Sequence, residues 1–119
     1  MSQIEVNIDA LTGQLNAAKD AQRKLERLQR LCKNKDFREL ILEEYCVQEC
    51  ARLTHMSIHP SQSSEERAKF LVMAQATGGV KLFIHAQEQM LASQINSIPK
   101  IEQELESARH EEQFEDDEA

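Results

Sequence analysis

The sequence predicts an all-α protein, and three observations support this prediction. Only five of the 119 residues are aromatic, three are glycine and two are proline, so strand-favouring and helix-breaking residues are scarce. Apolar residues recur at helical spacing through most of the chain. The loop-like stretches are few and short. We expect a helical bundle or extended helical hairpin of three to four helices, divided into a coiled-coil-like helix (residues 1–33), a helical core (34–98) and a short helix with an acidic tail (99–119).

The first helix is expected between residues 4 and 32, where apolar residues alternate at steps of four and three. Gly13 costs about 1 kcal/mol relative to alanine, and Gln22 and Gln29 interrupt the repeat. The pattern therefore favours an ordinary helix over a long autonomous coiled coil. This seam either packs on the protein's own helices or mediates self-association, and its members are Ile4, Ile8, Leu11, Leu15, Ala18, Leu25, Leu28, Leu31 and Cys32.

A second helix is predicted from about residue 36 to 55, with Asp36 as N-cap and Glu39 at the capping-box spacing. Projected at about 100° per residue, its apolar residues form two nearly opposite sides. Such a helix needs partners on both sides, so we expect it at the centre of the fold. One side holds Phe37, Leu40, Ile41, Val47 and Ala51, and the other holds Leu42, Cys46, Cys50 and Leu53.

The run SIHPSQSS, residues 57–64, is predicted to be a loop, because Pro60 prevents an easy continuation of the helix. Ser63, three residues before Glu66, and Ser64, next to Glu65, both offer caps for a third helix that extends towards Pro99. A pair of glycines at 78 and 79 lies in the middle of this helix. The helix either breaks there or continues, straight or kinked, with another helix packed closely against it, and we favour the continuous helix.

After Pro99, the spacing of Ile101, Leu105 and Ala108 predicts a short helix, followed by a frayed tail that leans towards disorder. From residue 102 to 119, nine acidic residues face one arginine, in a chain whose net charge is −7. Phe114 is the only large apolar residue of the tail. It either anchors a partner or is exposed without a role.

The composition also limits the compartment. The first residues contain no basic region followed by an apolar run, and no segment approaches the roughly 18 consecutive apolar residues of a membrane span. Three cysteines without a disulfide framework are typical of a reducing compartment. We therefore expect a soluble, unsecreted protein with no membrane partner.

The stretch CVQECARLTHMSIH places Cys46, Cys50, His55 and His59 at the spacing C-x3-C-x4-H-x3-H. Zinc takes these ligand types, but four of them must converge tetrahedrally. The two thiols would be neighbours on one helix face, and four intervening residues leave little chain to turn back towards them. Because both cysteines share a stripe with two leucines, we expect buried cysteines, no metal and no cofactor.

No enzyme is expected. Cys50 and His55 are compatible with a nucleophile and a base, but there is no glycine-rich phosphate loop, serine elbow or distinct pair of acids. Between Lys19 and Arg38, eight bases face three acids, which raises the question of nucleic acid. No aromatic residues accompany the basic cluster for base stacking, so a solvated face or a protein interface is the favoured interpretation.

The segment from Asn34 to Pro60 resembles small acidic helical proteins encoded among the head genes of tailed bacteriophages. It shares an Asn-x-Asp-Phe start, a Leu-Glu-x-Tyr core and an Arg-Leu end, and the heptad-like first helix and acidic C-terminus are also similar. The resemblance implies a structural role and assigns no catalytic residue. The matching positions are Asn34, Asp36, Phe37, Ile41, Leu42, Glu43, Tyr45, Glu49, Arg52 and Leu53.

We predict a non-enzymatic structural or assembly protein of a tailed phage, either a minor virion component or a head-assembly factor, in the host cytoplasm or the virion. Its expected partners are capsid, portal or scaffold proteins and further copies of itself, and not nucleic acid. The alternative is an inhibitor of a host enzyme whose acidic tail mimics nucleic acid. The predicted interface residues are Ile4, Ile8, Leu11, Leu15, Leu25, Leu28, Phe37, Ile41, Leu42 and Leu53.

Overall fold

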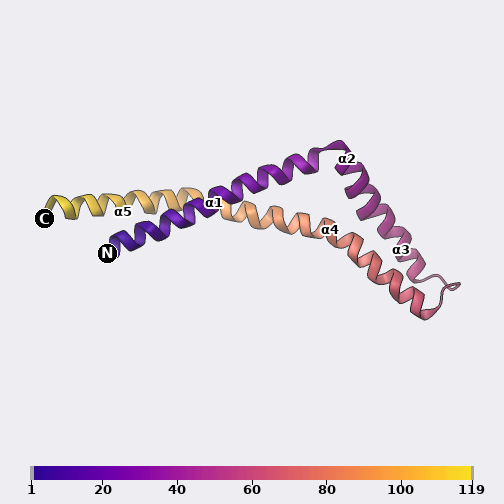
Figure 1. The fold of residues 1–119 in the computed structure, drawn as a ribbon. Coiled ribbons are helices and arrows are strands. Elements are labelled where there is room, and N and C mark those ends of the chain that lie inside the picture. Colours follow the sequence, from indigo (N-terminus) through magenta and orange to yellow (C-terminus); the bar gives the residue numbers. More distant parts are fainter. Residues whose placement is uncertain (1, 119) are drawn as a thin grey trace. The chain divides into compact units, whose positions relative to one another are not determined.

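Helices make up the fold. The computed structural model describes residues 2–118, and within this range the backbone forms helices and no strand, which confirms the all-α prediction. The segments α2, η1 and α3 follow one another with helical backbone at each junction, so they correspond to the single predicted second helix. Figure 1 shows α1 (Gln3–Lys33), α2 (Lys35–Phe37), η1 (Arg38–Glu49), α3 (Cys50–Ser57), α4 (Ser64–Asn96) and α5 (Ile98–Glu118).

Side-chain caps mark where two of the helices begin. The cap before α2 is Asn34, whose Oδ1 accepts a hydrogen bond from the Phe37 N–H at 3.0 Å. The prediction of Asp36 as N-cap was wrong: Asp36 lies in the first turn, where its charge faces the positive end of the helix dipole. Of the two predicted caps of α4, the structure uses Ser63, whose Oγ accepts from the Glu66 N–H at 3.1 Å, whereas Ser64 is the first residue of the helix.

Contacts divide the chain into two compact units, and unit 1 joins the chain's two ends, Met1–Glu26 and Gln89–Ala119. In unit 1, α1 and α5 lie side by side and antiparallel, as Figure 1 shows. Ile4 lies beside Phe114, and Gln14 lies beside Lys100. The predicted segments 1–33 and 99–119 thus pack on each other over much of their length. The core of this pair contains Leu11, Ile101, Leu105 and Ala108, flanked by Ile8 and Leu15.

The acidic segment of unit 1 is a helix, where a tail leaning towards disorder was expected. α5 extends to Glu118, and Pro99 stands in its first turn, where a missing N–H forfeits no helical hydrogen bond. Leu105 and Ala108 are each 4% exposed because they pack against α1. Beyond them Phe114 is 59% exposed. The apolar contacts of its first half anchor α5, and the charge pattern alone does not reveal them.

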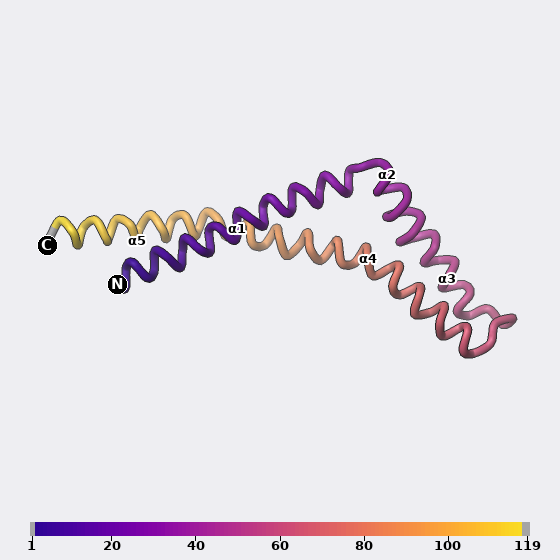
Figure 2. Tube along the Cα trace, in the orientation of Figure 1, coloured from indigo at the N-terminus to yellow at the C-terminus, as the bar shows by residue number. Residues whose placement is uncertain are grey.

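Unit 2 comprises residues Arg27–Glu88. Figure 2 shows the segment from α2 to α3 turning through the loop at 58–63 and returning along α4 in the antiparallel direction. Leu53 is 1% exposed and is the largest fully buried side chain of the described residues. The other buried residues of this pair are small, namely Cys46, Ala74 and Thr77. The core of unit 2 is therefore narrow.

Two features let the helices of unit 2 approach closely. α4 continues through both glycines, as predicted, and a Cβ built at Gly78 would lie 3.4 Å from Cys50 Sγ, whereas none at Gly79 would meet an atom within 4 Å. η1 is a π-helix, whose i→i+5 hydrogen bonds widen each turn. Residues about four apart therefore stay on one side, which aligns Cys46 and Cys50 towards α4.

Candidate functional site

The four residues of the CVQECARLTHMSIH stretch do not converge. Cys46 is buried, and Cys50 Sγ donates a hydrogen bond to the Ala74 carbonyl at 3.3 Å. The rings of His55 and His59 lie 5.5 Å apart at the far end of α3, edge to face. Among residues 2–118, no group of three or more His, Cys, Asp or Glu side chains is placed to hold a metal ion.

The chemistry of the three thiols is that of packing groups in this structure. Burial raises the pKa of the Cys32 thiol, and the negative charge of Glu88 raises it further. A raised pKa lowers the thiolate fraction at neutral pH, which is the opposite of what a catalytic cysteine requires. Cys50 is held against α4 by its hydrogen bond to a backbone carbonyl, and Thr54 Oγ1 donates to the Cys50 carbonyl at 2.7 Å.

The predicted interface residues fall into two groups. Those of the first helix face the chain's own helices to different degrees: Leu11 is buried and Ile8 and Leu15 pack against the same core, whereas Leu31 of the same seam is 46% exposed. Leu53 is buried within unit 2. The members that keep partly exposed side chains are Ile4, Ile8, Leu15, Leu25, Leu28, Phe37, Ile41 and Leu42.

The second apolar side of η1 and α3 is the clearest candidate for a docking surface in unit 2. The stripe that contains Cys46 and Leu53 is covered by α4, as their burial shows. On the other predicted side, Leu40 is 56% exposed and Val47 is 42% exposed, and Ala51 is exposed as well. We call these three residues, with Phe37 and Ile41, the outer side of η1. The described part of the chain buries Cys46 and Leu53 on one side of this segment, and on the other side it leaves Leu40, Val47 and Ala51 exposed and Phe37 and Ile41 half-buried.

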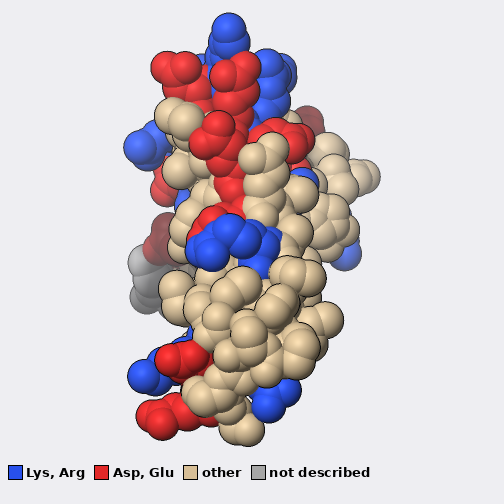
Figure 3. Space-filling model, turned by 90° about the vertical axis from the view of Figure 1, so that its right-hand side faces the viewer, with Lys and Arg blue, Asp and Glu red and all other residues tan. Residues whose placement is uncertain are grey.

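Uncharged surface is prominent where unit 2 turns from α3 into α4. Figure 3 looks onto this end, and uncharged side chains cover the middle of the lower half of that view, with Lys, Arg, Asp and Glu above them and along the lower edge. Ile58, at the end of α3, is 72% exposed. A groove between α3 and α4 is lined by Cys50, Thr54, Leu71, Ala74, Gln75, Gly78, Gly79 and Leu82.

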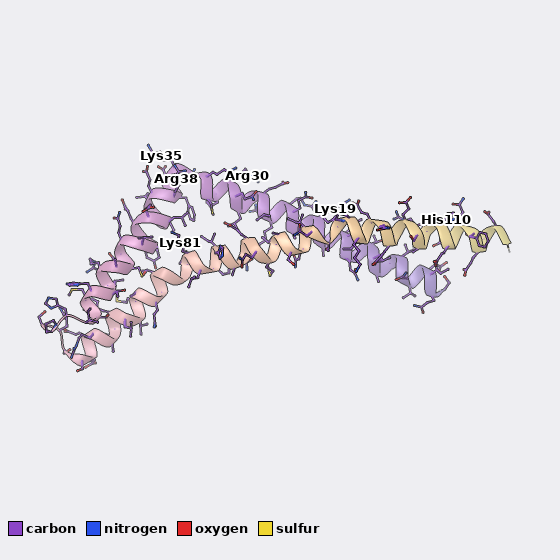
Figure 4. All side chains as sticks on the ribbon, turned by 180° about the vertical axis from the view of Figure 1, so that it is seen from behind. Lys19, Arg30, Lys35, Arg38, Lys81 and His110 are labelled. Atoms are coloured by element: carbon purple, nitrogen blue, oxygen red, sulfur yellow. The ribbon has the colours of Figure 1, made fainter. Side chains whose placement is uncertain are left out.

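The basic stretch contributes to both units. In unit 1, Arg23 forms an ion pair with Asp20, and both side chains are exposed. In unit 2, Arg30, Lys35 and Arg38 gather where α1 passes into α2, as Figure 4 shows. Acidic residues lie near this turn in the sequence, with Glu26 before it and Asp36 and Glu39 at and after it. This mixture is typical of a solvated surface, where single ion pairs contribute at most about 1 kcal/mol.

Two features of the site were not anticipated from the sequence. A capping box ties the start of α1, because Ser2 Oγ accepts from the Glu5 N–H at 3.1 Å and Glu5 Oε2 accepts from the Ser2 N–H at 3.3 Å. The S-x-x-E pattern was the available signal. A pair of ionic hydrogen bonds also joins Arg52 to Glu49, with Nε and Oε2 at 3.0 Å, and this partner lowers the pKa of Glu49.

Comparison with known proteins gives no match: no family model matches the chain, and neither a curated protein nor a solved structure matches it. Within residues 2–118, no helix is long and apolar enough to cross a membrane. The site is therefore interpreted from its own residues, and its most distinct feature is exposed apolar surface on helices.

Proposed function

We propose that this protein is a non-enzymatic structural or assembly protein that works through helix-mediated contacts with other proteins. The observation that carries the proposal is the outer side of η1, where Leu40 and Val47 are 56% and 42% exposed while the opposite stripe is buried. Exposed apolar side chains on a helix fit a groove or helix of a partner, because burying each of them removes apolar area from water.

The setting of this function comes from the sequence resemblance alone. The phage head-region proteins that the segment from Asn34 to Pro60 resembles suggest a minor virion component or a head-assembly factor. The partners would then be capsid, portal or scaffold proteins in the host cytoplasm or the virion. The resembling segment includes η1, so the same helix would carry both the resemblance and the contact.

A capture experiment tests this function. The tagged protein is recovered from phage-infected cells, from empty procapsids and from purified virions, and its partners are identified by mass spectrometry. We expect head proteins with the wild type and their loss in the double variant Leu40→Glu, Val47→Glu. The matched control is Gln48→Glu, which adds a charge at an exposed position of the same helix. Equal capture by wild type and double variant would contradict the proposal.

The second candidate is an inhibitor of a host nuclease or polymerase, and the helical state of the acidic segment favours it. α5 presents carboxylates from a rigid helix, and Glu102, Glu106 and Glu115 are exposed. Regularly spaced negative charges can occupy a site built for phosphates. Deleting the segment would also remove Leu105 and Ala108 from the core, so the proper test replaces exposed glutamates by glutamine. Inhibition of the host enzyme that survives this neutralisation would exclude charge mimicry.

A further inference from the structure

The side of α4 that faces away from the α2–α3 segment carries a second heptad-like seam. Val72, Ala76, Gly79, Phe83 and Ala86 recur at steps of four, three, four and three. At about 100° per residue these positions share one side of the helix, nearly opposite the buried Ala74. Gly79 lies at the edge of this side and also lines the groove to which Cys50 contributes. Val72 is 64% exposed and Phe83 is 63% exposed. We call these five residues the outer seam of α4.

The outer seam lies in the least charged part of the chain. The protein contains 21 acidic residues, yet none lies between Glu66 and Glu88. Lys81 is the only charged residue between Val72 and Ala86. Most other residues of this stretch are apolar, and an apolar side of a helix is ordinarily buried. In unit 2 only the side with Ala74 and Thr77 is buried.

We propose that the outer seam of α4 is a self-association interface, on which the same seam of a second copy packs around a two-fold axis. The acid-free stretch allows two chains of net charge −7 to approach without like-charge repulsion at the contact. The small residues Ala76, Gly79 and Ala86 let the two helices come close, and Phe83 supplies the large apolar anchor. This inference is separate from the proposed function, which uses the outer side of η1.

Sedimentation equilibrium of the full chain tests the interface. We expect the wild type to dimerise at micromolar concentration, and Val72→Glu with Phe83→Glu to raise the dissociation constant at least about 100-fold, because each change buries an unpaired charge in the symmetric contact. Ile58→Glu is the matched control, since it places the same charge at a 72% exposed apolar residue outside α4. It should leave the dissociation constant unchanged. Circular dichroism checks the helix content, and the serine replacements Val72→Ser and Phe83→Ser take over if the glutamate variant loses it.

Three results would overturn the proposal. They are a wild type that stays monomeric at all attainable concentrations, a dimer that tolerates the Val72 and Phe83 replacements, and a dimer that Leu40→Glu dissociates instead. Salt provides an independent check, because an apolar contact persists as ionic strength rises. A dimer lost at high salt would indicate charge pairing between the acidic α5 and the basic stretch, and so would also count against the seam. The variant with Val72→Glu and Phe83→Glu keeps Leu40 and Val47 unchanged. Its binding to head proteins therefore tests the proposed function and not the outer seam of α4.

Discussion

Few side chains hold this protein together, and single residues carry a correspondingly large share of its stability. In unit 2 the buried set is small in volume apart from Leu53, which is 1% exposed. Polar groups in the same layer are satisfied locally: buried Thr77 donates from Oγ1 to the Ala74 carbonyl at 2.8 Å. The Leu53 side chain thus supplies a large share of the apolar contact between α3 and α4.

Replacing Leu53 by alanine should lower the free energy of unfolding by about 2–5 kcal/mol. The lost side chain leaves a cavity between two helical segments, and few neighbouring side chains are available to fill it. Urea unfolding followed by circular dichroism measures the change. Ile58→Ala, at a 72% exposed position, is the control and should change stability by less than about 0.5 kcal/mol. A loss for Leu53→Ala no larger than that of the control would show that the helices of unit 2 do not pack as described.

The Cys32 thiol gives a pH-dependent prediction. Burial and then the Glu88 charge raise its pKa above the ordinary value, so the folded protein keeps this proton at a pH where the unfolded chain releases it. Its contribution to stability is therefore complete below the unfolded-state pKa and is lost as the pH rises through the raised folded-state pKa. Alkylation of Cys32 against pH, read by peptide mass spectrometry, should show a lower apparent pKa in Glu88→Gln. An unchanged profile would remove Glu88 as a cause.

At the scale of the helices, local caps decide where segments begin, and tertiary contacts decide whether they persist. Asn34 has extended backbone, with φ −63° and ψ 128°, and separates α1 from α2. α5 shows the effect of tertiary contacts. Its acidic sequence is typical of a solvated tail, but Ile101, Leu105 and Ala108 in its first half pack in the core of unit 1. Helices in proteins draw most of their stability from such packing.

Removing the cap in Asn34→Ala should destabilise the protein by about 0.5–2 kcal/mol, because the Phe37 N–H loses its acceptor. Asn34→Asp keeps an acceptor at the same place and should remain near the wild type. Thermal unfolding of the three proteins measures both effects. If the aspartate variant were as unstable as the alanine variant, the side-chain cap would not be the reason for the loss.

For the whole molecule, stability should depend on protein concentration. If the outer seam of α4 pairs two copies, unfolding is coupled to dissociation, and a tenfold rise in concentration stabilises the dimer by about 1.4 kcal/mol. Calorimetry at increasing wild-type concentration should therefore give a rising Tm. The variant with Val72→Glu and Phe83→Glu should give a constant Tm, and a constant Tm in the wild type would mean that folding does not require a second copy.

Much of the architecture was predictable from residue types and spacing. The scarcity of aromatic residues, glycine and proline predicted the all-α fold, and Pro60 with Ser63 predicted the loop and the start of α4. The stripe of Cys46, Cys50 and Leu53 predicted packing, and in the structure Cys46 and Leu53 are buried and the Cys50 thiol contacts α4. These features depend on interactions between near neighbours in the chain, which a sequence displays directly.

Only the tertiary structure decided which apolar face meets which. The apolar repeat in the first part of α1 packs against α5, although a tail leaning towards disorder was expected there. One side of η1 is covered, whereas Leu40 and Val47 remain exposed. The tertiary structure also showed the outer seam of α4 to be uncovered. Periodicity establishes that a face is apolar, but every apolar face gains by burial against any other. Which faces pair is set by loop lengths, small residues such as Gly78 and close-packed shape, and these act between residues far apart in the chain.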